Sequence, residues 1–290
     1  MKHLISRITI IFTLALIITF TACNKKDSST DPEFAAEDHT NSNAGSDDVI
    51  AVSENSMSKG DNSMGRLSQS RENANITDDV YKATITITPK ASPSDTGKIV
   101  IDFGSAGIKG IDGRTRTGKI NIKFTGPYHV AGKVQIITLE NYTVDGRKIE
   151  GKKVLSHVIL NNTDITTVIV TGGKLTYSDG TFTTWAGTKT RIWDPKGTLL
   201  DFSDDVVTVS GNINGISRNN ISYSAVIDPI ISPLVYTYTC FIQVGLVPVS
   251  GKITITPGNA LPRIIDFGSG TCDRNATFNV GSKSIPFTIK

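Results

Sequence analysis

The pentapeptide Ile85-Thr86-Ile87-Thr88-Pro89 recurs unchanged as Ile253-Thr254-Ile255-Thr256-Pro257. Each copy is followed by a second shared pentapeptide, Ile-Asp-Phe-Gly-Ser, at 101–105 and again at 265–269. Alternation of β-branched apolar residues with polar residues is typical of a strand that has one buried face. These matches predict a repeated strand–loop–strand unit, with one copy opening the folded body and one closing it, and the two copies could pair in space.

The same alternation occurs between the two copies, for example in Lys119-Ile120-Asn121-Ile122-Lys123-Phe124. Asp-Gly dipeptides at 112–113, 145–146 and 179–180 separate such runs, and Asp-Gly suits two-residue hairpins. Alternating strands favour antiparallel sheets with one face in water. We therefore predict an all-β domain over 80–290, with antiparallel sheets of about twelve to fourteen strands folded as a curved sheet, a sandwich or a partly open barrel.

The first 22 residues have the pattern of an export signal. Lys2 and Arg7 precede an apolar run that is shorter than the roughly 20 residues of a membrane-spanning helix. The run ends in Phe20-Thr21-Ala22-Cys23, which resembles a lipobox, where the cysteine is acylated before cleavage. We predict a signal peptide over 1–22 and lipidation of Cys23; an ordinary signal followed by a free cysteine is the alternative. The lipid would attach the protein to the outer membrane, on either its periplasmic or its surface side.

The segment after Cys23 differs sharply from the body in charge. Residues 24–79 carry 12 acidic and 5 basic side chains, whereas residues 80–290 carry 15 acidic and 23 basic ones. The first segment has few large apolar residues and no sustained helical period, so we expect 23–79 to be a disordered acidic tether. The basic body suggests attraction to anionic glycans or lipid headgroups. Nucleic acid is not an expected partner of an exported protein.

Cys240 and Cys272 are the two cysteines that are left once Cys23 is lipidated. Two cysteines in an exported domain usually pair, so we predict a disulfide, with two buried thiols as the alternative. The chain contains no Cys-x-x-Cys, His-Glu-x-x-His or Gly-x-Ser-x-Gly motif, and no glycine-rich phosphate loop. We therefore assign no catalytic residue, metal site or cofactor. Asp102 and Asp266, in the two repeat copies, are interpreted as turn caps rather than as an acid–base or metal-binding pair.

The segment between the two tryptophans of the chain holds the candidate ligand-binding residues. Trp185, Lys189, Arg191 and Trp193 would share one face of a strand, because alternate side chains point the same way. With a two-residue turn at Asp179-Gly180, Lys174 would lie opposite Trp185, unless Gly172-Gly173 forms a bulge. Indoles beside cations can stack on sugar rings and hold acidic groups. The alternative is that the rings pack beneath lysine and arginine stems.

With these residues in view, the chain resembles a family of uncharacterised Bacteroidota-type lipoproteins. The resemblance covers most of 80–290 and rests on the repeated Ile-Asp-Phe-Gly-Ser, the stretch 113–119, the stretch 185–193 and Cys272-Asp273. Members often have a cysteine after the first Ile-Asp-Phe-Gly, where this chain has Ala106-Gly107. The resemblance implies an all-β exported lipoprotein and supplies no catalytic residues.

These observations together predict a non-enzymatic lipoprotein of the cell envelope whose β body binds an anionic glycan or an envelope protein. A structural or assembly lipoprotein without a small ligand is one alternative. A concave β half-barrel that carries lipid is the other.

Overall fold

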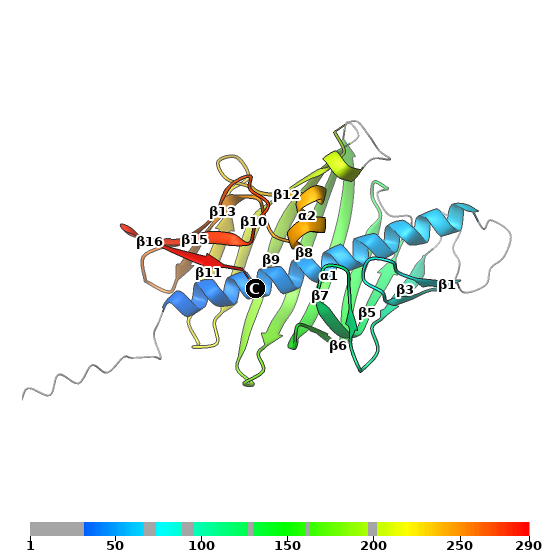
Figure 1. Cartoon of the computed structure of the whole chain (residues 1–290), viewed down its shortest axis with the longest axis horizontal. Helices are drawn as coiled ribbons and strands as arrows, with labels where there is room; N and C mark the ends of the chain where they lie inside the picture. The colour runs from blue at the N-terminus through cyan, green and yellow to red at the C-terminus, as the bar shows by residue number, and fades with distance from the viewer. Residues whose placement is uncertain are drawn as a thin grey trace, which may run out of the picture.

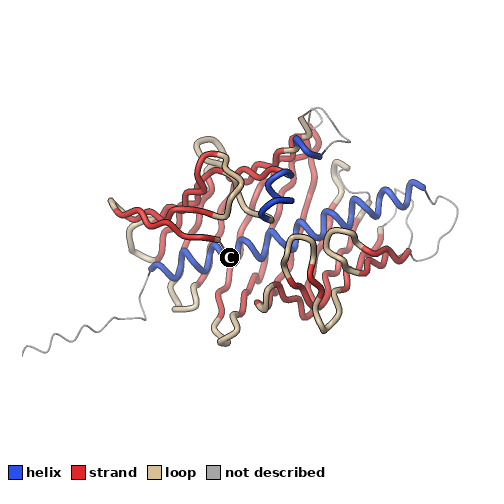
Figure 2. The backbone as a smooth tube through the Cα atoms, in the orientation of Figure 1, coloured by secondary structure: helices blue, strands red, loops and turns tan. Residues whose placement is uncertain are grey.

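The computed structural model describes residues 32–66, 74–88, 96–126, 130–160, 163–196 and 202–289. Its strands form a single antiparallel sheet of 16 members, and Figure 2 shows them as one continuous curved layer crossed by a long helix. The predicted all-β class and the curved antiparallel sheet are confirmed. A two-sheet sandwich is not formed by the described residues. The predicted signal peptide and Cys23 lie outside the described residues.

The sheet order follows the chain almost without exception, from β1 at one edge to β16 at the other. The strands are β1 (Ala74–Thr77), β2 (Thr84–Thr88), β3 (Gly97–Asp102), β4 (Ile108–Lys109), β5 (Thr115–Phe124), β6 (Val134–Val144), β7 (Arg147–Leu160), β8 (Thr163–Thr176), β9 (Phe182–Asp194), β10 (Val206–Ile216), β11 (Ser222–Ile227), β12 (Leu234–Thr237), β13 (Ser250–Pro257), β14 (Arg263–Ser269), β15 (Asn275–Val280) and β16 (Lys283–Thr288). The helices are α1 (Pro32–Arg66), the short α2 (Tyr238–Val244) and the 3-10 turn η1 (Phe202–Asp204). Within the described residues, neither α-helix is both long and apolar enough to cross a membrane.

Helix α1 is the main difference from the sequence-based prediction. Its 35 residues extend for about 52 Å and cross the strands of the sheet (Figure 1). It contacts β3 and β13, which lie near opposite ends of the sheet order, and also β8 and β9 between them. From Phe34 to Met57 only Glu37 is exposed. The prediction of a disordered tether is therefore wrong for residues 32–66, and the sheet itself begins before residue 80, at β1.

The period of α1 is present in the sequence, but small and polar side chains conceal it. Its buried positions include pairs at 35/36, 38/39, 42/43, 45/46, 49/50, 52/53 and 56/57, a spacing of alternately three and four residues, and Asp48 is buried as well. Only some of these are apolar, such as Ala35, Val49 and Ile50. Gly45 lets the helix approach the sheet, because a Cβ there would lie 2.7 Å from Ile149 Cδ1. Tertiary packing rather than helix propensity therefore holds this helix.

The core lies between α1 and the face of the sheet that α1 covers, which we call the inner face. Alternate strand residues supply it, and many are isoleucines that are almost fully buried, namely Ile85, Ile87, Ile101, Ile120, Ile122, Ile137, Ile149, Ile253, Ile255 and Ile265. The residues between them face outward and are mostly polar, as in the Thr-Ile-Thr-Ile-Thr of β2. This is the one-sided burial that the alternation predicted.

The two repeat copies adopt the same register. Ile85 pairs with Ile101 in the first copy, and Ile253 pairs with Ile265 in the second. The copies lie near opposite ends of the sheet and share no ladder, so they do not pair in space. The turn-cap interpretation of the two aspartates agrees with the structure, because Asp102 Oδ1 accepts from Gly104 N at 2.8 Å and Asp266 Oδ1 accepts from Gly268 N at 2.9 Å.

Candidate binding site

Four of the five predicted ligand-binding residues share the inner face of β9, but that face is not open. Trp185 is 5% exposed and Lys189 is 2% exposed. Lys189 Nζ lies 2.8 Å from Asp47 Oδ1 of α1, and Arg191 pairs with Glu54 of α1. Helix α1 therefore covers the surface that was expected to meet a ligand.

The predicted position of Lys174 is wrong by one residue. The connection between β8 and β9 has five residues rather than two, because Asp179 Oδ1 accepts from both the backbone N and the Oγ1 of Thr181. Lys174 consequently pairs with Thr184 and lies on the outer face, with its Nζ 4.4 Å from the centroid of the Phe182 ring. A one-residue shift in register moves a side chain to the other face.

Gly173 takes the position opposite Trp185. A Cβ on this glycine would lie 2.5 Å from the indole, so the ring of Trp185 rests directly on the glycine backbone. The register of β8 against β9 shifts between Val170 and Gly173. This is the position at which the sequence allowed for a bulge at Gly172-Gly173. Trp185 therefore packs as a core residue.

Acidic residues of α1 are matched to basic residues of the sheet along much of the helix. Asp38 lies 2.7 Å from Arg218 Nη2, and Asp47 and Glu54 pair with Lys189 and Arg191. The acidic residues of the N-terminal segment therefore form ion pairs with basic residues of the body of the same chain. Lys189 and Arg191, two of the predicted ligand-binding cations, are thus already paired, whereas Lys153 Nζ is buried with no hydrogen-bond partner among the described residues.

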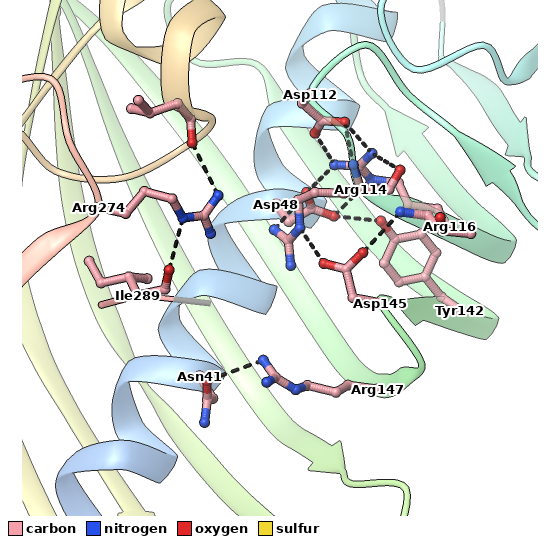
Figure 3. Close-up of polar contacts among 12 residues, drawn as sticks. Asn41, Asp48, Asp112, Arg114, Arg116, Tyr142, Asp145, Arg147, Arg274 and Ile289 are labelled. Atoms are coloured by element: carbon pink, nitrogen blue, oxygen red, sulfur yellow. Dashed lines mark hydrogen bonds and ion pairs between the residues drawn. The ribbon is translucent and has the colours of Figure 1, made fainter. Parts of the chain in front are cut away.

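The most elaborate of these contacts surrounds Asp48 (Figure 3). Its carboxylate accepts from Arg116 Nη2 at 2.5 Å, Tyr142 OH at 2.7 Å and Arg114 Nη1 at 3.2 Å. Asp112 accepts from Arg116 on the other side. Burial alone would raise the pKa of the Asp48 carboxyl, but the guanidinium groups of Arg116 and Arg114 hold that pKa below its usual value. This cluster fixes the middle of α1 to β5 and β6.

A cavity of about 230 Å³ opens beside this contact, between α1, the strands β9, β10 and β12, and α2. Five aromatic side chains contribute to its walls, and we call it the aromatic pocket: Tyr81, Trp193, Tyr236, Tyr238 and Phe241. The cross-strand row of Trp193, Val207 and Tyr236 forms one side, since Val207 pairs with both neighbours. Two of the predicted residues, Arg191 and Trp193, line the pocket.

The polar groups of the aromatic pocket are held by specific contacts. Trp193 Nε1 donates to Asp205 Oδ2 at 2.7 Å, which fixes the plane of the indole. Tyr236 OH donates to Asp47 Oδ2 at 3.3 Å, and Glu54 pairs with Arg191. Three carboxylates and one guanidinium thus stand among aromatic rings. Each carboxylate accepts from at least one donor, and the second oxygen of Asp205, Oδ1, is buried without a hydrogen bond to another described residue.

The wall formed by α2 is anchored by covalent and polar contacts. Cys240 of α2 forms a disulfide with Cys272, with 5.1 Å between the Cα atoms. Arg274 donates from Nη1 to Val244 O at 3.2 Å and from Nε to Ile289 O at 2.8 Å (Figure 3). Together these contacts tie α2, which carries Phe241, to the segment after β14 and to the C-terminal strand.

The remaining predicted residues lie elsewhere. Trp185 and Lys174 border a broad open depression of about 760 Å³, whose other lining residues are mostly glycine, serine and threonine. Lys189 borders neither cavity. Tyr81, Tyr236, Tyr238 and Phe241 were not among the predicted residues. The aromatic density of the stretch 236–241 is a signal for the last three, and Tyr81 has no comparable signal. No cluster of three or more metal-ligating side chains occurs in the described part of the chain.

Comparison with protein-family models gives no match. Comparisons with curated proteins and with solved structures give none either. The proposals below therefore rest on the residues of this chain alone.

Proposed function

We propose that this chain is a lipid-anchored, non-enzymatic binding protein of the cell envelope that holds a neutral sugar unit of a glycan in the aromatic pocket. The resemblance of residues 20–23 to a lipobox supports the anchor. The observation that carries the binding proposal is the pocket itself, where Trp193 and four further aromatic side chains stand beside polar groups. Aromatic faces pack against the C–H faces of sugars, while carboxylate and hydroxyl groups hydrogen-bond to sugar hydroxyls.

Size and charge favour a neutral sugar over the acidic glycan expected from sequence. A volume of about 230 Å³ suits one small unit rather than an extended chain. The pocket is lined by Asp47, Glu54 and Asp205 against a single cation, Arg191. A carboxylate of an acidic sugar would therefore meet like charges.

The test is a glycan array probed with the mature chain, its Trp193→Ala variant and its Phe182→Ala variant. Phe182 is the matched control, because it lies on the same strand and is 49% exposed outside the pocket. We expect the wild-type chain to bind at least one glycan on the array. Trp193→Ala should weaken the binding of that glycan by about tenfold, or about 1.4 kcal/mol, and Phe182→Ala should leave it unchanged.

Equal binding by wild type and Trp193→Ala would remove the pocket as the site. An array on which the folded wild-type chain binds no glycan would favour the structural or assembly alternative. Circular dichroism of each variant separates lost binding from lost folding.

A further inference from the structure

A second cavity, of about 410 Å³, lies at the N-terminal end of α1 and has a different character. It is bounded by the first turns of α1 and by β14–β16, and its lining is mainly apolar: Phe34, Ile265, Phe278, Ile285, Phe287 and Ile289. We call it the apolar groove. Ile285 is 46% exposed, so the groove reaches the surface. Its volume is within the usual range for small-molecule sites, which are also mostly apolar.

The polar side chains at the groove are Glu37, Thr40, Asn41 and Thr288, and three of them have partners within the protein. Glu37 pairs with Arg218 Nη2 at 3.2 Å. Asn41 accepts from Arg147 Nη1 at 3.2 Å, and Thr40 Oγ1 donates to Ala36 O at 2.8 Å. These groups are satisfied within the protein. An occupant is therefore recognised by apolar contact, as a hydrocarbon chain would be.

The groove lies close along the chain to the predicted lipidation site. Phe34, which lines the groove, is in the first turn of α1, and eight residues separate Cys23 from Pro32. Even when fully extended, that connection spans no more than about 32 Å. An acyl group on Cys23 would thus stay near the groove at a high effective concentration.

We propose that the apolar groove holds one acyl chain of the protein's own N-terminal lipid. This inference rests on the lipid-anchor part of the proposed function and is independent of the aromatic pocket, which α1 lines from Asp47 onward. The groove and the bilayer would compete for that chain. Because a single acyl chain gives only marginal membrane attachment, sequestering one chain would adjust how firmly the protein is held.

The test uses cells fed a palmitate analogue that carries a photoreactive diazirine. After illumination, peptide mapping of the full-length processed protein locates the cross-links. We expect them on peptides of β14–β16, and at least fivefold fewer in Ile285→Asp. Ile216→Asp is the matched control, because Ile216 is 44% exposed and lies outside the groove; it should cross-link as wild type does.

Cross-linking that is unchanged in Ile285→Asp, or that occurs only to lipid or to another protein chain, would overturn the proposal. The mass of the peptide that contains Cys23 shows separately whether Cys23 is acylated. An unmodified Cys23 would refute the anchor itself, whereas an acylated Cys23 without groove cross-links would refute only the groove. Circular dichroism of both aspartate variants checks that they are folded.

Discussion

Arg116 of β5 and Asp48 of α1 form a buried, two-pronged ion pair. Arg116 Nη2 lies 2.5 Å from Asp48 Oδ1, and Arg116 Nε lies 3.1 Å from Asp48 Oδ2. Arg116 has no exposed side-chain surface, and Asp48 is 3% exposed. The pair joins a helix and a strand 68 residues apart in the chain, and it explains how so polar a helix can be buried.

Replacing Asp48 with Asn should therefore destabilise the protein strongly. Removing one partner of a buried pair leaves the other charge uncompensated, which typically costs about 3–5 kcal/mol. Urea denaturation measures the change in the free energy of unfolding. The control is Glu150→Gln, because Glu150 pairs with Lys148 at the surface and should contribute less than about 1 kcal/mol. A loss below 1 kcal/mol in Asp48→Asn would show that α1 is not held by this cluster.

His39 of α1 should make stability fall in mildly acidic solution. Burial and the nearby Lys189 lower the pKa of His39 to about 3, although Asp47 acts in the opposite direction. Below pH 6.5 the histidine takes up a proton in the unfolded chain but not in the folded chain. The free energy of unfolding therefore falls as the pH is lowered from about 6.5 to about 3. Between pH 6.5 and pH 4.5 the expected loss is about 2 kcal/mol.

Urea denaturation of wild type and His39→Gln across that range checks this prediction. Glutamine does not titrate, so the variant should lack most of the slope. Asp48 does not interfere, because its lowered pKa removes stability only at still lower pH. Parallel slopes in the two proteins would mean that His39 is solvated in the native state.

The disulfide should contribute to stability and to the shape of the aromatic pocket. It closes a loop whose ends are 32 positions apart, and in the chain-entropy model such a loop stabilises by about 3–4 kcal/mol. The Cys240→Ser, Cys272→Ser double variant should lose about this amount in urea denaturation. Wild type treated with a reductant is the matched comparison and should lose the same. An unchanged midpoint in both would argue that packing alone holds α2.

The strands were predictable from the sequence because their side-chain period is explicit. The Ile-Thr alternation of β2 and β13 reports both the strand and its buried face. The register across β8 and β9 was not predictable, since it depends on whether Asp179 caps a longer turn. A shift of one residue in this register decides on which face of the sheet Lys174 lies.

Helix α1 could not be predicted from hydrophobicity for a physical reason. Its buried pairs include Asp38-His39, Ser42-Asn43 and Gly45-Ser46, and in two of them one polar side chain has its partner in a distant part of the chain. Asp38 is buried because Arg218 is present, and Asp48 because Arg116 and Tyr142 are. The acidic composition that indicated a solvated tether is instead matched to a basic sheet.

The candidate site was predicted only in part. The segment 185–193 directed attention to β9, and Arg191 and Trp193 of that strand line the aromatic pocket. The remaining walls come from α1, α2 and the segment around Tyr81, which meet only in the folded chain.

The two tryptophans allow sugar binding in the aromatic pocket to be tested in one experiment. A ¹⁵N-labelled mature chain gives one indole N–H signal from Trp185 and one from Trp193, which single Trp→Phe variants assign. The measurement is a titration of this chain with the glycan that it bound on the array. We expect the Trp193 signal to shift, because its N–H donates to Asp205 at the pocket wall, and the Trp185 signal to stay in place. A shift of the Trp185 signal alone, or of neither signal while the glycan binds, would contradict sugar binding in this pocket.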